Sequence, residues 1–311
     1  MMGFCRIFSR KGDGTVIPSY LNGGDEVAIV SPSFSVDSKK IEDAVRVLES
    51  WGLKTRLGDH LFLSDGPFAG SDKQRLEDIQ KMLNAREIKA ILFARGGYGA
   101  IRIVDKIDFS VLRKNPKWLV GFSDITVFHL WLGKKLGMAT IHGEMPVNFG
   151  NSDKTPETME TLRDALFGGL SRIGWQGNVL RPAEARGEII GGNLSLVYSL
   201  VGTAGDIETR GKILFLEDVG EQYYHIDRML VSLKLAGKLD QLSGLIVGSF
   251  NKMEETTVPW GKSIEDIVSS ITEEYGYPVY FNFPGGHAKD NRAFYLGRRA
   301  RLLPGNIMKF D

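Results

Sequence analysis

Residues 117–126 read KWLVGFSDIT, a short apolar run that ends at Gly121 and is followed at once by Ser123 and a helical pattern. The pattern predicts a buried strand over 118–121 and a helix over 124–132. Ser123 would then lie between them, beside free backbone N–H groups and the positive end of the helix dipole. A nucleophile that develops an oxyanion needs such surroundings. The alternative is a serine that only caps the helix, although one serine can do both.

Alternating strand and helix patterns surround this segment. Ile41, Ala44, Val45 and Leu48 recur at helical spacing after a predicted strand at 26–30. Further strands are predicted at 53–57, 90–94, 187–190, 212–216, 244–249 and 279–281, and further helices at 72–83, near 193–202, 222–236 and 263–274. The last twenty residues alternate weakly and are expected to form terminal strands. The alternation predicts an α/β fold with a doubly wound parallel sheet and right-handed crossovers.

The character of the chain changes between residues 150 and 185. A turn and a helix to about Leu166 are followed by a glycine-rich polar stretch. We therefore expect a first domain over 1–160 that carries Ser123, a linker over 161–185, and a second domain over 186–311. Residues 1–22 read as a loose leader.

Composition narrows the possible functions. Of 311 residues, 42% are hydrophobic and 25% are charged, which is typical of a globular protein. The net charge is +1, so overall electrostatic attraction does not favour binding to nucleic acid or to an anionic membrane. Cys5 is the only cysteine, which excludes an intrachain disulfide. Met1–Lys11 is too polar for a signal peptide, and no apolar run approaches the roughly 18 residues of a membrane span. We expect a cytoplasmic protein without membrane or nucleic-acid partners.

Three further polar or glycine-rich segments follow predicted strands, and such segments meet at the carboxyl edge of a parallel sheet. The first is 95–99, RGGYG, an oxyanion donor loop or merely a tight turn. It lacks the spacing of a dinucleotide fingerprint. The second begins at Glu217, which could orient an imidazole or be an ordinary loop acid. The third is 284–291, PGGHAKDN, a glycine-containing loop that could present His287 to the site as a general base.

A serine hydroxyl needs a neutral imidazole to take its proton and a third group to fix the imidazole tautomer. Ser123, His287 and Glu217 supply one of each. The other histidines, at positions 60, 129, 142 and 225, are expected to be structural. The sequence His142-Gly143-Glu144 resembles a zinc-deaminase motif, but no Cys-x-x-Cys pair accompanies it. No metal or other cofactor is therefore expected.

Taken in order, these motifs resemble the LD-carboxypeptidase family, serine peptidases that include murein tetrapeptide carboxypeptidases and microcin-immunity peptidases. The resemblance covers nearly the whole chain. Its matching segments are 24–32, 94–99, 121–126, 191–194, 215–218 and 286–287 with Asn291.

The resemblance implies a Rossmann-like N-terminal domain and a β-rich α+β C-terminal domain, with the active site at their junction. It implies Ser123 as nucleophile, Glu217 as triad carboxylate and His287 as general base, with the backbone N–H groups of Asp124 and Gly97 as the oxyanion hole. The implied function is release of the terminal D-alanine of a murein tetrapeptide in the cytoplasm, by a homodimer.

An exopeptidase must also bind a free carboxylate, for which Arg95 is the nearest cation, although a structural ion pair is the alternative role. Asn193 could contact the substrate backbone or merely cap a helix. Three other functions remain open: a microcin-type peptidyl-nucleotide hydrolase, an α/β-hydrolase esterase, and a non-catalytic muropeptide-binding module. The missing second glycine of the nucleophile turn, replaced by Ile125, argues against the esterase.

Overall fold

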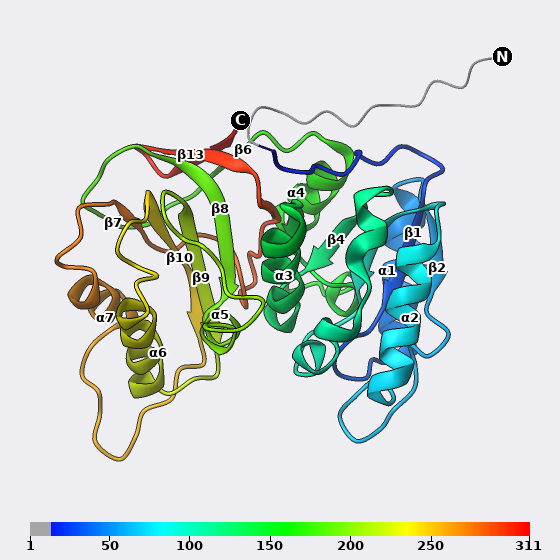
Figure 1. Cartoon of the computed structure of the whole chain (residues 1–311), viewed down its shortest axis with the longest axis horizontal. Coiled ribbons are helices and arrows are strands. Elements are labelled where there is room, and N and C mark those ends of the chain that lie inside the picture. The colour runs from blue at the N-terminus through cyan, green and yellow to red at the C-terminus, as the bar shows by residue number, and fades with distance from the viewer. Residues whose placement is uncertain (1–13) are drawn as a thin grey trace.

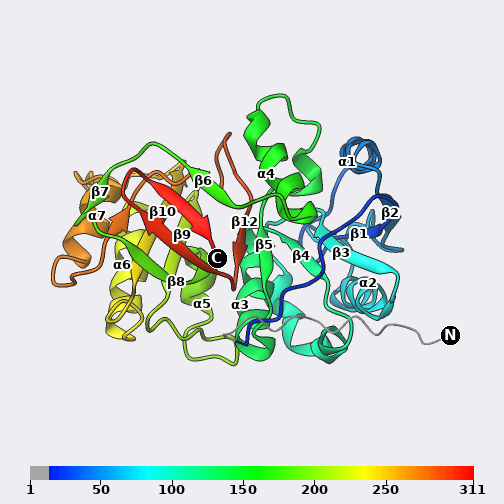
Figure 2. The ribbon, with the colours of Figure 1, turned by 90° about the horizontal axis from the view of Figure 1, so that it is seen from above.

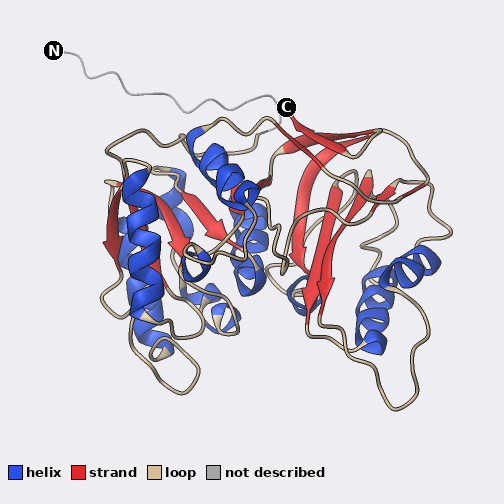
Figure 3. Cartoon of the chain, turned by 180° about the vertical axis from the view of Figure 1, so that it is seen from behind, coloured by secondary structure: helices blue, strands red, loops and turns tan. Residues whose placement is uncertain are grey.

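The computed structural model describes residues 14–311, which form two β-sheets that lie side by side with helix α3 between them (Figures 1 and 3). Cys5 and the polar N-terminal stretch over 1–11 lie outside the described residues. No helix within the described part of the chain is both long and apolar enough to cross a bilayer.

The first sheet has six strands in the order β12-β5-β4-β3-β1-β2. Five of them are parallel, and only β12 runs antiparallel to its neighbour β5. The strands are β1 (Glu26–Val30), β2 (Lys54–Leu57), β3 (Ile88–Phe93), β4 (Trp118–Gly121), β5 (Thr140–His142) and β12 (Phe294–Leu296). The parallel sheet predicted for the N-terminal half is confirmed.

Helices cover both faces of the first sheet, as the continuous apolar strands require. Val27 and Ile29 of β1 share a core with Ile41, whereas Ala28 shares the opposite core with Ile79. The helices are α1 (Ser38–Ser50), α2 (Asp72–Asn84), α3 (Thr126–Leu136) and α4 (Pro156–Phe167). The side chains of Asp37 and Ser71 cap α1 and α2 by accepting hydrogen bonds from backbone N–H groups of the first turn.

The second sheet has eight strands in the order β6-β14-β13-β8-β9-β10-β11-β7 and makes the C-terminal half β-rich, as expected. Its strands are β6 (Arg172–Gly174), β7 (Val179–Leu180), β8 (Ala185–Asn193), β9 (Ile213–Val219), β10 (Gly244–Asn251), β11 (Val279–Tyr280), β13 (Arg299–Leu303) and β14 (Ile307–Phe310). Its helices are α5 (Leu194–Ser199), α6 (Tyr223–Leu235) and α7 (Ile264–Ile271). In Figure 1, α6 and α7 lie together on one side of this sheet.

The two sheets are joined by more than the linker. Strand β12 belongs to the C-terminal half in sequence but pairs with β5 in the first sheet, as Figure 2 shows. Phe294 of β12 packs against Phe215 of β9 and Phe283, with ring centroids 4.9 and 5.2 Å away. An aromatic cluster therefore fixes the sheets to each other at the place where the carboxyl ends of β4, β5, β8 and β9 meet. The domain limits inferred from sequence remain a prediction.

One local difference from the expected elements concerns the nucleophile turn. The predicted helix at Asp124 is preceded by a 3-10 turn over Ser123–Ile125, and α3 begins only at Thr126. Ser123 has φ +63°, a conformation that costs a residue with a side chain about 1–3 kcal/mol. A second difference is a run of 3-10 turns at Ala100–Arg102, Val104–Lys106 and Phe109–Arg113, for which the sequence gives no periodic signal.

Candidate active site

The structure brings Ser123, His287 and Glu217 together in one hydrogen-bonded chain. His287 Nε2 lies 3.1 Å from Ser123 Oγ, and His287 Nδ1 lies 2.8 Å from Glu217 Oε2. Glu217 is completely buried, while Ser123 and His287 are partly accessible. This is the geometry in which a carboxylate fixes the imidazole tautomer and the imidazole can take a proton from the hydroxyl.

Each of these residues reaches the site for a local reason. Ser123 follows β4, and its left-handed backbone turns the hydroxyl out of the sheet edge. Glu217 lies near the end of β9, whose side chains are buried as far as Asp218. His287 follows Gly286, where φ is +105° and an added Cβ would lie 2.4 Å from Glu217 Oε2. Only glycine therefore lets this loop approach the carboxylate closely enough for His287 to bind it.

Opposing effects act on the proton affinity of His287. Burial lowers the pKa of the imidazole, but the charge and hydrogen bond of Glu217, with further negative charge at Asp218 and Glu144, outweigh it. The net pKa of His287 is raised above 6.5. The negative surroundings thus stabilise the imidazolium that forms when His287 takes a proton.

The glycine loop adjoins the serine. A Cβ on Gly96 would lie 3.1 Å from Ser123 Oγ, so the backbone of this loop approaches the hydroxyl directly. Neither the Gly97 nor the Asp124 N–H donates a backbone hydrogen bond within residues 14–311. An N–H group that binds an oxyanion must lack such a partner, so the expectation for these two groups stays a prediction.

The Asp124 side chain has a different task from its backbone N–H. Its Oδ2 atom accepts hydrogen bonds from Ser33 Oγ at 2.5 Å and from the Ala100 N–H at 2.8 Å. These bonds tie the serine turn to the loops after β1 and β3. Burial raises the pKa of this carboxyl, and the two hydrogen bonds only partly oppose that effect.

Arg95 and Asn193, the two further candidates, are placed differently. Arg95 is exposed, donates a hydrogen bond from Nη1 to the Ser35 carbonyl at 3.0 Å, and lies over the Phe34 ring. Asn193 is buried, and its side chain both caps α5 and donates to Asp218 Oδ1 at 2.8 Å. Arg95 can therefore reach a ligand, whereas both ends of the Asn193 amide are already occupied within the fold.

The remaining histidines lie outside the chain of hydrogen bonds. His60 pairs with Asp78, and His225 pairs with Glu221. His129 and His142 are buried, and burial lowers the pKa of His129 to about 4. Within residues 14–311, no cluster of three histidine, cysteine or acidic side chains could hold a metal ion.

Sequence reasoning missed a buried carboxylate at the same edge of the first sheet. Glu144 is completely buried and pairs with Lys154 Nζ at 2.6 Å. It follows β5, a three-residue strand too short to be recognised from its sequence. A carboxylate two positions after that strand would have been the signal.

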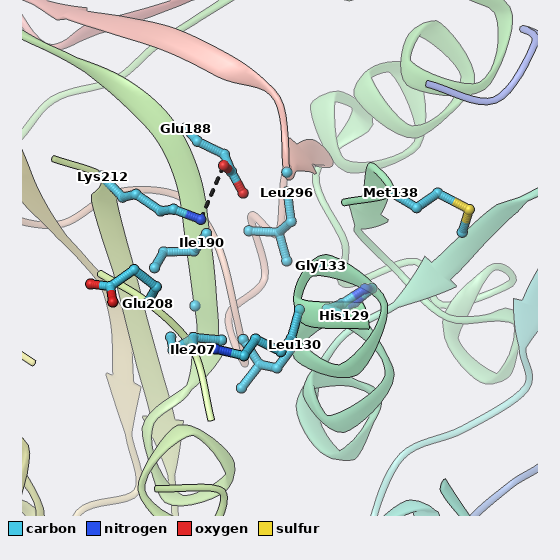
Figure 4. Close-up of a pocket in the computed structure, with 13 residues that line it drawn as sticks. His129, Leu130, Gly133, Met138, Glu188, Ile190, Ile207, Glu208, Lys212 and Leu296 are labelled. Atoms are coloured by element: carbon cyan, nitrogen blue, oxygen red, sulfur yellow. Dashed lines mark ion pairs between the residues drawn. The ribbon is translucent and has the colours of Figure 1, made fainter. Parts of the chain in front are cut away.

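A cavity of about 220 Å³ lies between α3 and β8, away from Ser123, His287 and Glu217 (Figure 4). Leu130, Ile190 and Leu296 line it, and Glu188 pairs with Lys212 at its edge, 3.0 Å apart. Lys212 precedes β9, whereas Glu217 lies near the end of that strand, so this cavity is at the opposite end of the sheet junction.

Comparison with known proteins matches both halves of the chain. Residues 27–143 match the LD-carboxypeptidase N-terminal domain and residues 186–302 the C-terminal domain of the same family. A probable murein peptide carboxypeptidase of Bacillus subtilis is 37% identical over 92% of this chain and 91% of its own length. The murein tetrapeptide carboxypeptidase of Pseudomonas aeruginosa is 31% identical, over 91% and 94%.

Solved structures show the same fold. The muramoyltetrapeptide carboxypeptidase of Oxalobacter formigenes matches with a TM-score of 0.82 and 28% identity, over 92% of this chain and 97% of that one. The protein MccF, solved in complex with glutamyl sulfamoyl guanosine, matches with a TM-score of 0.85 and 20% identity, over 94% and 98%. Together with the sequence matches over both halves, these findings show that the chain belongs to the LD-carboxypeptidase family of serine-type carboxypeptidases.

Proposed function

We propose that this enzyme hydrolyses the L,D-peptide bond that releases the terminal D-alanine of a murein tetrapeptide. The proposal rests on the hydrogen bonds of the His287 imidazole, which lies between the other two residues. Its Nε2 is 3.1 Å from Ser123 Oγ, and its Nδ1 is 2.8 Å from Glu217 Oε2. The two relatives named above as murein carboxypeptidases, both more than 30% identical, support the choice of substrate.

The proposed reaction is acyl transfer. His287 takes the Ser123 proton as the oxygen attacks the carbonyl carbon, and the backbone N–H groups of Gly97 and Asp124 bind the oxyanion. Removal of one such donor typically costs about 2.7–4 kcal/mol of transition-state stabilisation. His287 then gives its proton to the departing D-alanine amine, and water, activated by the same imidazole, releases the acyl group. Glu217 keeps the imidazole oriented throughout.

The exposed guanidinium of Arg95 is our candidate for binding the carboxylate of the terminal D-alanine. It adjoins Gly96, whose backbone approaches Ser123, and its hydrogen bond to the Ser35 carbonyl occupies only Nη1 of the guanidinium among residues 14–311. Asn193 is proposed only to shape the site, because its side chain already binds Asp218 and the α5 N-terminus.

The principal alternative is hydrolysis of a peptidyl nucleotide. The MccF fold, matched with a TM-score of 0.85, accommodates the same arrangement of strands and helices, but at 20% identity it speaks for the fold alone. A binding module without catalysis is disfavoured, since binding requires no imidazole aligned between a serine and a carboxylate.

Mass spectrometry of the products from defined substrates tests the proposal. A muramoyl tetrapeptide that ends in D-alanine should lose the mass of one alanine residue, while the same peptide ending in L-alanine should remain intact. Cleavage of an aminoacyl sulfamoyl nucleoside with no release of D-alanine would support the alternative and overturn our proposal.

We also propose that the enzyme acts in the cytoplasm as a homodimer, which follows from the family resemblance. Light scattering of the full chain at micromolar concentration tests the second part, and a mass of one chain would contradict it. Fractionation of the source cells tests the first part.

A further inference from the structure

The loop that carries His287 is fastened to the first sheet by a buried carboxylate. Glu144 lies two residues beyond β5, on the sheet that also carries Ser123. Its side chain has no solvent exposure, and four donors satisfy its two oxygens. These donors are Met145 N and Asn148 Nδ2 at Oε1, 3.1 and 2.8 Å away, and Lys154 Nζ and Asn291 Nδ2 at Oε2, 2.6 and 3.2 Å away.

Asn291 transmits this attachment to His287. Its Nδ2 donates to Glu144, and its Oδ1 accepts a hydrogen bond from the Gly286 N–H at 2.8 Å. Gly286 immediately precedes His287 and packs against Glu217. Asn291 is itself completely buried. A movement of its amide would therefore displace the backbone next to the imidazole.

Lys154 supplies a second attachment on the other side of His287. Its Nζ binds Glu144 and also donates to the Ala288 carbonyl at 2.8 Å. The side chain is only 12% exposed, so its charge needs the Glu144 carboxylate beside it. The residues on both sides of His287 are thus held by one buried ion pair.

The His287 loop has to be held against both sheets at once. Ser123 lies on the first sheet and Glu217 on the second, and His287 must contact both. The His287 loop is attached to the second sheet through Asn251 Nδ2, which binds the His287 carbonyl at 2.6 Å. The Glu144 network provides one attachment to the first sheet. It acts together with hydrogen bonds from Thr155 N and Thr158 Oγ1 to the Lys289 carbonyl, at 3.3 Å each, and with the Phe122 ring, whose centroid lies 4.9 Å from that of the imidazole.

We propose that Glu144, Lys154 and Asn291 are positioning residues that fix His287 between the nucleophile and its carboxylate partner. The inference rests on the proposed function of the three residues that they align. It assigns no chemical step to the network, because none of its members contacts Ser123. A misplacement of about 1 Å at a reacting group can cost about 100-fold in rate, so such alignment matters.

The charge of Glu144 adds a second effect. The acidic groups that act on His287 are Glu217, Asp218 and Glu144, and each raises the pKa of the imidazole. Lys154 is the cation that faces Glu144. Replacement of Glu144 by glutamine removes one negative charge and should lower the pKa of His287. The acid limb of the pH–rate profile should then move to lower pH.

The first test is Asn291→Ala, with Asn306→Gly as its matched control. Asn306 is also a buried asparagine, and its Nδ2 donates to the Gly177 carbonyl at 2.7 Å, but it lies in the turn before β14, where its φ of +55° suits glycine. We expect Asn291→Ala to lower kcat about 10- to 100-fold with little change in KM. Asn306→Gly should change only the melting temperature. Equal kcat values for the two variants, with both chains folded, would overturn the proposal.

The second test is a double-mutant cycle across the central hydrogen bond. Glu144→Gln places an amide NH2 group against the Lys154 ammonium or against the Met145 and Asn148 N–H donors, and Asn291→Ala removes the other side of the bond. We expect each single variant to lose at least about 10-fold in kcat, and the double variant to lose little more than the worse single variant, because both act through the position of His287. Losses that multiply in the double variant would overturn the positioning role.

Failure of the proposed function can be told from failure of this inference. The rate at which a fluorophosphonate labels Ser123, and the pKa of His287 measured by NMR, require no murein substrate. If the wild-type enzyme releases no D-alanine but Asn291→Ala still slows labelling, only the substrate proposal fails. If D-alanine is released but neither labelling nor the imidazole pKa responds to Asn291→Ala and Glu144→Gln, the positioning proposal fails.

Discussion

The two ends of the junction between the sheets are built from the same elements but differ in chemistry. Helix α3 and strands β8 and β9 extend from one end to the other. At one end, Ser123, Glu217 and His287 form a chain of directional hydrogen bonds. At the other end, Leu130 and Ile190 line a cavity of about 220 Å³ with no such chain among its lining residues.

The two ends differ in how well they tolerate substitutions. At the serine end, the site depends on hydrogen bonds with defined distances and angles, so a small displacement of one atom weakens them. At the cavity end, side chains meet unfilled space, which lets a small addition be accommodated. We therefore expect substitutions at the serine end to change turnover and those at the cavity end to change only stability.

The largest effect is expected from Ser123→Ala. Loss of the hydroxyl removes the nucleophile and should lower kcat roughly 10⁶-fold. Alanine retains the strain of the positive φ at this position, so the melting temperature should change little. D-alanine release and thermal unfolding are the two measurements. Turnover within tenfold of wild type would remove Ser123 from the mechanism.

Glu217→Gln should have the next largest effect, about 10⁴-fold in kcat, because the amide no longer selects the productive tautomer of His287. The wild-type imidazole must be neutral to accept a proton, and its pKa is raised, so the acid limb of kcat/KM should lie above pH 6.5. Loss of the Glu217 charge lowers that pKa and should move the limb toward lower pH. A limb that stays in place would show that another group titrates.

Gly286→Ala should lower kcat by about 100-fold, because its Cβ would lie 2.4 Å from Glu217 Oε2 and displace the His287 loop. Gly305→Ala is the matched control: its φ of +84° imposes similar backbone strain, but no atom lies within 4 Å of the added Cβ. Both variants should lose stability and only Gly286→Ala should lose activity. Equal activities would mean that the close approach to Glu217 is unimportant.

The smallest effect is expected at the cavity end. Gly133 lies inside α3, lines the cavity, and has no atom within 4 Å of an added Cβ. Gly133→Ala should stabilise the protein by about 0.5–1 kcal/mol through its higher helix propensity. Denaturant unfolding and steady-state kinetics measure the two quantities. A change in kcat of more than twofold would show that the two ends of the junction are coupled and that substitutions at the cavity end do not change stability alone.

Much of the architecture could be predicted from sequence because it depends on local patterns. The strand at 118–121 agrees with β4, and the helix predicted at 72–83 agrees with α2 to within one residue. Ser123, Glu217 and His287 could be selected because each follows or ends an apolar strand. The fold class and the family are confirmed, whereas the domain limits and the roles of the site residues remain predictions.

What could not be predicted depends on contacts between distant segments. No local pattern in Phe294–Leu296 reveals that this strand pairs with β5. Glu144 could not be recognised from the sequence as part of the site, because its partners Lys154 and Asn291 are 10 and 147 positions away. The burial that makes this carboxylate informative exists only in the folded chain.

The pairing of β12 with β5 has a consequence for synthesis on the ribosome. Residues 140–142 are among the first half of the chain to emerge, yet their neighbouring strand at 294–296 emerges almost last. The edge of the first sheet therefore stays open while residues 143–293 are translated, which is a state prone to intermolecular pairing. A nascent chain stalled before residue 294 should recruit holdase chaperones that the completed polypeptide no longer needs.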